Sequence, residues 1–231
     1  MTAETPRYTT ILFDLDDTLL DSVESARLAF DETMASIGVD DPDVHRPLFG
    51  EINADLWGKV ETGELMPNAV KTLRFEQLVE QAGFDTDPLT LADIYGRGLG
   101  MHGSLYPGAH EMLEALSDVA TLAIITNGIG EIQRSRLAHH DLGRYFDDVV
   151  ISGEVGHSKP GSRIFEVALE RLGNPQKSTV AMIGDSLSSD MPGAAAFGID
   201  SIWFDVQDRD PGDALVTHRV SSLMEIPAIV L

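Results

Sequence analysis

The chain has 231 residues and no cysteine, which excludes disulfide bonds, thiolate metal sites and a cysteine nucleophile. Its 38 acidic and 16 basic residues give a formal net charge of −22, which disfavours nucleic acid and anionic membranes as partners. Hydrophobic residues make up 43%, enough for a folded core, but no apolar run reaches the roughly 18 residues of a membrane span. The N-terminal segment lacks the apolar run of a secretory signal, so we expect a soluble, cytoplasmic protein.

The acidic residues are spread along the chain rather than gathered in a tail, and only 4 of the basic residues are lysines. Repulsion among so many like charges destabilises a compact chain at low ionic strength. Molar salt shortens the Debye length to about 3 Å and screens that repulsion. We therefore expect a halophile-like source with a salty cytoplasm, and an ordinary acidic protein is the alternative.

The first predicted strand covers residues 8–13 and ends at Asp14. Beyond it, residues 22–96 are mostly helical in pattern, with apolar residues recurring every three or four positions. We expect this insertion to form a helical cap, while residues 1–21 and 97–231 form the catalytic core.

The core continues with an amphipathic helix that is predicted from Pro107-Gly108 through Leu116. Four further apolar runs are predicted to be strands, at residues 120–125, 148–152, 179–184 and 200–204. Helical patterns separate them, beginning near Glu131, at Pro160 and after Asp190. Near-continuous apolar runs are typical of strands buried on both faces of a parallel sheet. The alternation predicts an α/β fold with a doubly wound, Rossmann-like parallel sheet.

Polar residues follow four of the predicted strands, at the edge where a doubly wound sheet forms its ligand site. They are Asp14 and Asp16, then Thr126, Asn127 and Gly128, then Lys159, and finally Asp185 and Asp190. Carboxylates as close as Asp14 and Asp16 repel each other, so a cation is their natural third partner. With Asp185 they offer oxygen ligands with no His or Cys among them, a set that favours Mg²⁺ over Zn²⁺.

Each of these residues also has a purely structural interpretation. Asp14 and Asp16 could form a turn, residues 126–128 could cap a helix, and Lys159 could be a solvated surface lysine. A cap with free amides also suits phosphate binding, because an anion uses the same donors. Asp190 is either a helix N-cap or part of the metal shell. The joint occurrence of these residues at successive strand ends favours a catalytic site.

The segments DLDDT, TNG, KP and GDSLSSD resemble, in order, the four motifs of the haloacid dehalogenase superfamily. The resemblance covers the whole core, and the insertion lies where the helical-cap members carry theirs. It implies that Asp14 is the nucleophile, which forms an aspartyl-phosphate, and that Asp16 is the general acid and base. Thr126 and Lys159 would hold the phosphoryl oxygens, with Asn127 and Gly128 beside them at the substrate. The implied Mg²⁺ ligands are Asp14, the backbone carbonyl of Asp16, Asp185 and, as inner or outer ligand, Asp190.

Other activities remain open. The 2-haloacid dehalogenases of the same superfamily act on carbon–halogen bonds without a metal and lack the second acid, whereas Asp16 is present here. A phosphonatase needs a cap lysine for a Schiff base, and Lys59 and Lys71 are the cap lysines. A receiver-like phospho-Asp signalling domain has a similar residue set but no large first crossover. Asp16 and the cap favour a Mg²⁺-dependent phosphomonoester hydrolase acting on a small phosphorylated metabolite.

The stretch from Val150 to Pro175 looks most similar to the house-cleaning pyrimidine 5′-nucleotidase branch, as do INADLW and LRFEQL in the cap. Phosphoglycolate, N-acylneuraminate 9-phosphate and other sugar-phosphate phosphatases are the neighbouring alternatives. Asn53 and Trp57 share a helical face, and an amide beside an aromatic plane suits a nucleobase. Alternatively, Trp57 packs between cap helices and Asn53 is solvated. We expect a nucleoside 5′-monophosphate phosphatase that is a monomer or homodimer.

Overall fold

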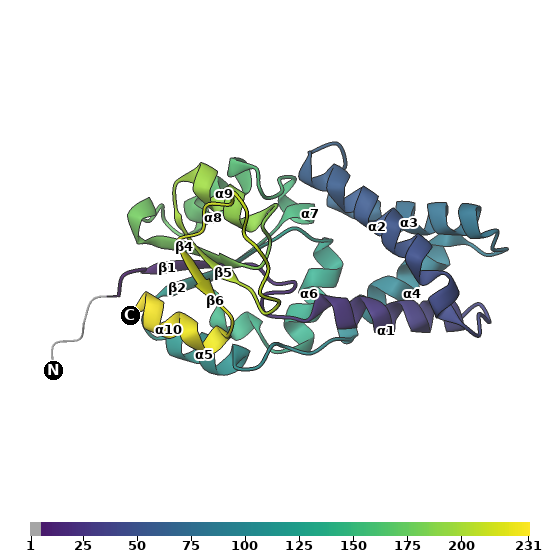
Figure 1. Ribbon diagram of the computed structural model, residues 1–231, viewed down its shortest axis with the longest axis horizontal. Helices are drawn as coiled ribbons and strands as arrows, with labels where there is room; N and C mark the ends of the chain where they lie inside the picture. Colours follow the sequence, from purple (N-terminus) through teal and green to yellow (C-terminus); the bar gives the residue numbers. More distant parts are fainter. Residues whose placement is uncertain (1–5) are drawn as a thin grey trace.

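The computed structural model describes residues 6–231 and contains a six-stranded parallel sheet (Figure 1). The strands are β1 (Thr10–Phe13), β2 (Thr121–Thr126), β3 (Asp148–Ile151), β4 (Val180–Gly184), β5 (Asp200–Phe204) and β6 (His218–Val220). Their spatial order is β3-β2-β1-β4-β5-β6, which confirms the predicted doubly wound α/β fold. Residues 1–5 lie outside the described residues. Two expectations involve them, namely that they belong to the core and that the N-terminal segment is not a secretory signal.

All five predicted strands are present, although β1 begins at Thr10 rather than at residue 8. The sixth strand, β6, is not among the predicted strands. Its three residues, His218–Val220, include two polar ones and make no apolar run. It pairs with β5 alone and closes one edge of the sheet.

Helices cover both faces of the sheet because neighbouring strand residues point to opposite sides. Ile11 and Phe13 pack with α5 and α10, while Leu12 packs on the other face with α8 and α9. The helices of this sheet domain are α5 (Ala109–Ser117), α6 (Gly130–His139), α7 (Ser152–Val155), α8 (Ser162–Arg171), α9 (Asp190–Phe197) and α10 (Ile226–Val230). Short 3₁₀ helices cover Gly143–Tyr145, Lys177–Thr179 and Leu223–Glu225.

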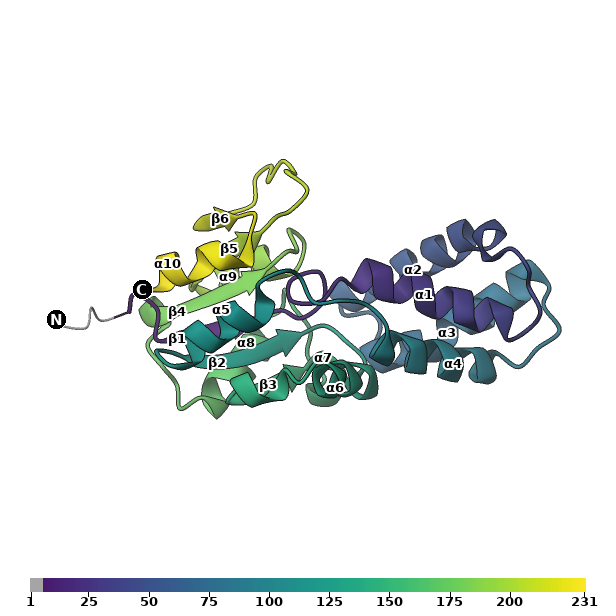
Figure 2. The ribbon, with the colours of Figure 1, turned by 90° about the horizontal axis from the view of Figure 1, so that it is seen from below.

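Four helices between β1 and α5 form a second body, which we call the cap unit (Figures 1 and 2). They are α1 (Ser22–Ala35), α2 (Arg46–Glu61), α3 (Pro67–Ala82) and α4 (Pro88–Met101), with a 3₁₀ turn at Pro42–Val44. The unit has its own core, in which the rings of Phe49, Phe75 and Tyr95 have centroids 5.2–5.4 Å apart. The expected boundary at residue 96 falls inside α4, because the helix continues to Met101.

The cap unit lies beyond the carboxyl ends of the strands and contacts the sheet domain mainly through α6 (Figure 2). Lys71 of α3 lies 2.6 Å from a carboxylate oxygen of Glu131, and Asn68 donates to the carbonyl of Gly153 at 2.9 Å. Ile129 and Ile132 belong to the apolar core of the cap unit. The cap therefore covers the edge of the sheet where the predicted site lies.

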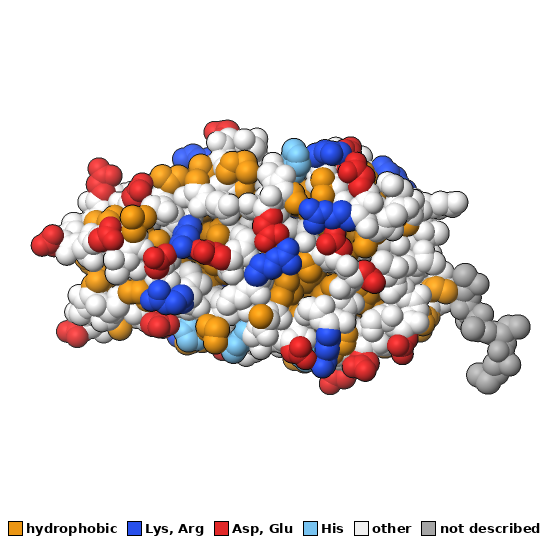
Figure 3. All heavy atoms as spheres, turned by 180° about the vertical axis from the view of Figure 1, so that it is seen from behind, with side chains coloured by type: hydrophobic (Ala, Val, Ile, Leu, Met, Phe, Trp, Pro, Cys, Tyr) orange, Lys and Arg blue, Asp and Glu red, His pale blue; other side chains and the backbone are white. Residues whose placement is uncertain are grey.

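Acidic side chains lie over both the cap unit and the sheet domain on the face drawn in Figure 3. Basic side chains are interspersed among them rather than gathered into one patch on that face. This agrees with the even spread of acidic residues along the sequence. Within residues 6–231, no helix has both the length and the apolar character that crossing a membrane requires.

Candidate active site

Asp14 and Asp185 come together because they follow adjacent parallel strands. Asp14 directly follows β1, Asp185 directly follows β4, and Phe13 lies opposite Ile183 in the ladder. The backbone N–H of Asp14 donates to the carbonyl of Ile183 at 2.8 Å, which extends the pairing by one residue. The parallel register thus joins two motifs that are distant in the sequence.

Lys159 is 1% exposed and lies in the loop between α7 and α8. Its Nζ donates to Oδ1 of Asp14 at 2.5 Å and lies 2.7 Å from Oδ1 of Asp190. The second contact is an ion pair without hydrogen-bond geometry. The side chain of Asn127 fixes this loop, because it accepts from the Lys159 N–H and donates to the Lys159 carbonyl, each at 2.8 Å.

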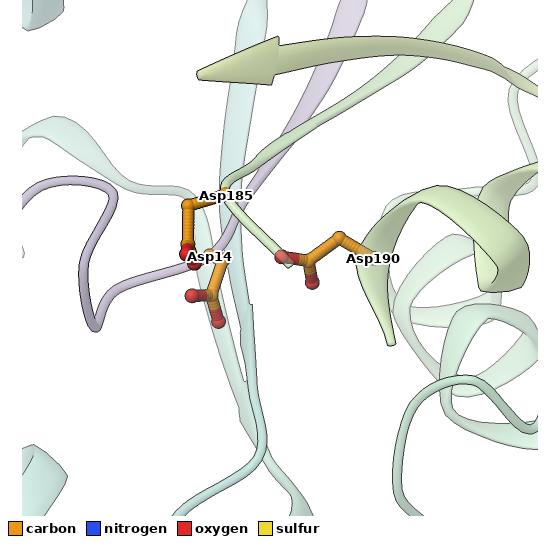
Figure 4. A group of neighbouring side chains, drawn as sticks. All are labelled: Asp14, Asp185 and Asp190. Carbon is orange, nitrogen blue, oxygen red and sulfur yellow. The ribbon is translucent and has the colours of Figure 1, made fainter. Parts of the chain in front are cut away.

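Asp14, Asp185 and Asp190 form a cluster in which each offers a carboxylate oxygen within 4.8 Å of the others (Figure 4). Asp190 points from the start of α9 toward the other two. Gly184 leaves room for this, since a Cβ there would lie 2.2 Å from Oδ2 of Asp190. Lys159 contacts Asp14 and Asp190, and Nη1 of Arg209 lies 3.6 Å from Oδ2 of Asp185, so three carboxylates share two cations and negative charge is left unbalanced. An all-oxygen set of this kind fits a hard divalent cation such as Mg²⁺.

The pKa values of these groups reflect the same charge imbalance. Burial raises the pKa of Asp14 well above its ordinary value, and Asp190 and Asp16 add to this against the opposing effect of Lys159. Burial, helped by Asp190, raises the pKa of Asp185 to about 7. Burial would lower the pKa of Lys159, but Asp14 and Asp190 outweigh it and raise that pKa, so Lys159 is charged at neutral pH. A bound divalent cation would favour the ionised carboxylates.

The carboxylate of Asp16 is not part of the cluster. Gln133 Nε2 donates to Oδ2 of Asp16 at 2.8 Å, and Nη1 of Arg136 donates to Oδ1. The same Gln133 nitrogen donates to Oγ1 of Thr126 at 2.8 Å, which connects these two predicted catalytic residues. Helix α6 therefore orients the Asp16 side chain, and the metal role implied for Asp16 concerns its backbone carbonyl alone.

Asn127 and Gly128 line the same pocket as Asp16, one of the predicted catalytic residues, and the two residues do different things there. Both polar atoms of the Asn127 side chain bond to the backbone of Lys159, so this side chain holds the Lys159 loop beside the pocket. A Cβ at Gly128 would lie 2.5 Å from Nε2 of Gln133. Glycine at this position lets Gln133 reach Asp16.

A pocket of about 260 Å³ lies between the cap unit and the sheet domain. The sheet domain and its connecting loops contribute Asp16, Asn127, Gly128, Ile129, Ile132, Gln133 and Arg136. The cap unit contributes Ser22, Ala26, Asn53, Trp57, Arg74, Tyr95 and Leu99. Asn53 and Trp57 are both half-buried, and Trp57 lines the pocket while it also packs against the cap core. The nearly buried Asp14 and Lys159 lie outside this lining, next to Asp16.

The family model of haloacid dehalogenase-like hydrolases matches residues 8–198, which is most of the chain. The chain belongs to this hydrolase family.

Its similarity to individual proteins extends over nearly the whole chain. The HAD-hydrolase YfnB of Bacillus subtilis is 30% identical over 95% of this chain and 94% of its own length. The crystal structure of YfnB bound to magnesium, described as revealing interdomain movement, has a TM-score of 0.88 and covers 97% of this chain and 99% of that one. The pyrimidine 5′-nucleotidases YjjG of Escherichia coli and PynA of Streptococcus pneumoniae are 32% and 33% identical over 95% of this chain, covering 96% and 93% of their own lengths.

The site of this hydrolase includes polar residues that our sequence analysis missed. Gln133 and Arg136 are three apart on α6 and both buried, so they share the helix face that meets Asp16. The sequence signal for these two residues is a glutamine and an arginine three positions apart, a few residues after the TNG segment. Arg74 is also buried, at the cap end of the pocket. It stands between Val70 and Leu78 on the apolar face of α3, where a charged residue breaks the pattern.

Proposed function

We propose that this hydrolase removes phosphate from small phosphomonoesters through a covalent intermediate on Asp14, with Mg²⁺ as its cofactor. The observation that carries the proposal is the buried contact between Asp14 and Lys159, inside a carboxylate cluster and beside a pocket lined by Asp16. A 2-haloacid dehalogenase needs neither a metal-binding carboxylate cluster nor a second acid. The presence of both in one place supports phosphate chemistry.

The chemistry proceeds in two displacements at phosphorus. A carboxylate oxygen of Asp14 attacks phosphorus and forms a P–O bond, while the bond from phosphorus to the leaving oxygen breaks. The carboxyl proton of Asp16 passes to that oxygen, so the leaving group departs as a neutral alcohol. Asp16 then takes a proton from water as the water oxygen attacks phosphorus, and inorganic phosphate leaves the regenerated Asp14. Gln133 and Arg136 hold Asp16 in place for both proton transfers.

Positive charge at the site offsets the repulsion between Asp14 and a phosphate dianion. Lys159 supplies one such charge from inside the fold, in direct contact with Asp14. Asp14, Asp185 and Asp190 would hold Mg²⁺, which when bound supplies further positive charge to the phosphoryl oxygens. The need for both is strong in a chain whose formal net charge is −22.

The substrate that best fits the pocket is a pyrimidine nucleoside 5′-monophosphate. Two relatives of nearly the same length are pyrimidine 5′-nucleotidases. The pocket offers an aromatic plane from Trp57 and an amide from Asn53 on its cap wall, and Asp16 lines the same pocket. A planar base with polar edges uses both features.

Movement of the cap unit would admit the substrate and then exclude water from the reaction. The two domains meet in part through polar contacts near the surface, among them Lys71 with Glu131 and Ser188 with Glu61. Their large apolar cores are separate, apart from Ile129 and Ile132 at the base of α6. Contacts of this kind break at low cost, which supports a cap that opens and closes as one body.

The proposal is tested by a hydrolysis screen in Mg²⁺ and high KCl. The panel contains uridine, cytidine and adenosine monophosphates, phosphoglycolate, a sugar phosphate, phenyl phosphate and 2-chloropropionate. Asp14→Asn should abolish phosphate release without lowering the melting temperature, while Asp213→Asn at an exposed position should change neither. Full activity of Asp14→Asn, or release of chloride but not phosphate, would contradict the proposed mechanism. Preference for a non-nucleotide ester would contradict the substrate assignment alone.

A further inference from the structure

Arg74 is a buried cation in the cap unit without an acidic partner. It is 2% exposed, and its guanidinium lies over the ring of Tyr95, 4.4 Å from the centroid. Nη1 lies 3.4 Å from Oδ1 of Asn53, whereas Nε and Nη2 are buried and make no hydrogen bond within residues 6–231. No ion pair to Arg74 occurs in that part of the chain. Within residues 6–231, the positive charge is therefore offset only by one neutral amide oxygen, of Asn53, and by the ring faces of Tyr95 and Phe75.

This arrangement differs from that of Arg136, the other buried arginine of the pocket. Arg136 donates to Asp16, to the side chain of Gln133 and to the carbonyl of Leu99, so its charge and its N–H groups have partners. Burying a guanidinium without such partners is costly, and contact with an aromatic ring offsets part of that cost. Burial lowers the pKa of Arg74 to about 10, which still leaves the side chain protonated at neutral pH. The unbalanced charge implies a partner that the chain itself does not provide.

The position of Arg74 indicates where that partner binds. Arg74 and Asn53 both line the pocket between the two domains, together with Trp57 and Tyr95. Because the Asn53 carbonyl faces Arg74, the amide nitrogen of Asn53 is left to donate to another group. Asp16 is the acidic residue of the pocket, and it is already held by Gln133 and Arg136. The cap end of the pocket is thus rich in donors and positive charge.

We propose that Arg74 and Asn53 form a subsite that binds an oxygen acceptor on the leaving group of the substrate. This inference rests on the proposed function and deepens it, because the acceptor in a pyrimidine nucleotide is a carbonyl oxygen of the base. Uracil and cytosine both carry a carbonyl at C2, whereas adenine carries none. A carboxylate on a smaller ester offers the same acceptor chemistry, so the experiment separates the two sources.

The test compares wild type with Arg74→Met on esters that differ in their acceptors. Removing a charged donor should lower kcat/KM for uridine and cytidine monophosphates by roughly ten- to a hundredfold, chiefly through KM. Adenosine monophosphate and phenyl phosphate, which lack a carbonyl, should lose less than about threefold. The melting temperature should stay the same or rise, because methionine fills a similar volume without an unbalanced charge. Arg97→Met, at an exposed arginine of α4, should leave every substrate unchanged.

Each outcome decides one question. Equal losses on all esters, with a lower melting temperature, would show that Arg74 is a structural residue and overturn the subsite. A selective loss on phosphoglycolate, in an enzyme that does not prefer nucleotides, would keep the subsite, assign it a carboxylate and refute the nucleotide substrate. Asn53→Ala provides a second variant, because Asn53 is half-buried and its truncation leaves the cap core intact. Like Arg74→Met, it should lose more activity on uridine and cytidine monophosphates than on adenosine monophosphate and phenyl phosphate. An Asn53→Ala variant with the substrate preference of wild type would also overturn the subsite.

Discussion

Replacing Lys159 by methionine tests the charge balance of the site most directly. Lys159 contacts two carboxylates, Asp14 and Asp190, and both partners are almost fully buried. Methionine keeps most of the side-chain volume but removes the charge, so two buried carboxylates lose their shared cation. Breaking a buried ion pair in this way costs about 3–5 kcal/mol. For a chain of this length that corresponds to a fall in melting temperature of roughly 6–20 °C.

The cost should depend on pH in a defined direction. Burial and Asp190 already raise the pKa of Asp14, and removing Lys159 raises it further. A carboxyl whose pKa is higher in the folded state stabilises the fold at low pH, and this stabilisation is lost as the pH rises through that pKa. The difference in stability between wild type and Lys159→Met should therefore be small at acidic pH and grow as the pH rises toward the alkaline range. Mg²⁺ should restore part of the lost stability, because the ion replaces the missing positive charge.

Thermal unfolding in metal-free buffer across this pH range, repeated with Mg²⁺, measures both effects. Lys59→Met is the matched control, since Lys59 pairs with Asp55 on the exposed surface of α2. An exposed pair of this type contributes about 0.5 kcal/mol or less. A loss in Lys159→Met no larger than in Lys59→Met would refute the reasoning, as would a difference in stability that shrinks with rising pH.

Three further predictions concern catalysis, metal and salt. Asp16→Asn should lower kcat by roughly a hundredfold or more, because the amide transfers no proton; rapid-quench kinetics with an unchanged dephosphorylation step would contradict its dual role. Chelation with EDTA should abolish phosphate release and lower the melting temperature, and Mg²⁺ should restore both; activity that persists in EDTA would rule out the metal-dependent mechanism. The melting temperature should rise steeply from low salt to molar KCl and then level off, because 38 acidic side chains repel one another until screened; a melting temperature independent of KCl would refute adaptation to salt.

The sheet and the chemistry of its edge could be predicted because both depend on local sequence. Buried parallel strands are apolar throughout, so five of the six strands are visible as runs. Once those strands are parallel and adjacent, Asp14 and Asp185 must lie close together, whatever the rest of the chain does. The strand β6 cannot be recognised in this way, because it is short, contains polar residues and pairs with a neighbour on one side only.

The apolar periodicity predicts the helical insertion, but it does not predict the residue at which the insertion ends. Helix α4 contains three glycines near its end, at residues 96, 98 and 100, and glycine usually signals a helix stop. Here the glycines serve packing instead, since a Cβ at Gly98 would lie 2.8 Å from the Cβ of Ala29 in α1. Close contact between α1 and α4 overrides the weak helix propensity, so the helix continues to Met101.

The residues that we propose for specificity were the hardest to predict from the sequence, for a physical reason. A catalytic carboxylate is recognisable beside a strand end, whereas an arginine on a helix is ordinarily a solvated residue. Only its register distinguishes Arg74 in the sequence, because Val70 and Leu78 place it on the buried face of α3. The register shows that the charge is buried, but which groups surround it depends on how α2 and α4 pack against α3 and how the cap meets α6. Each predicted catalytic residue is therefore recognisable from the strand end that it follows, whereas the proposed selectivity depends on residues that only tertiary packing brings together.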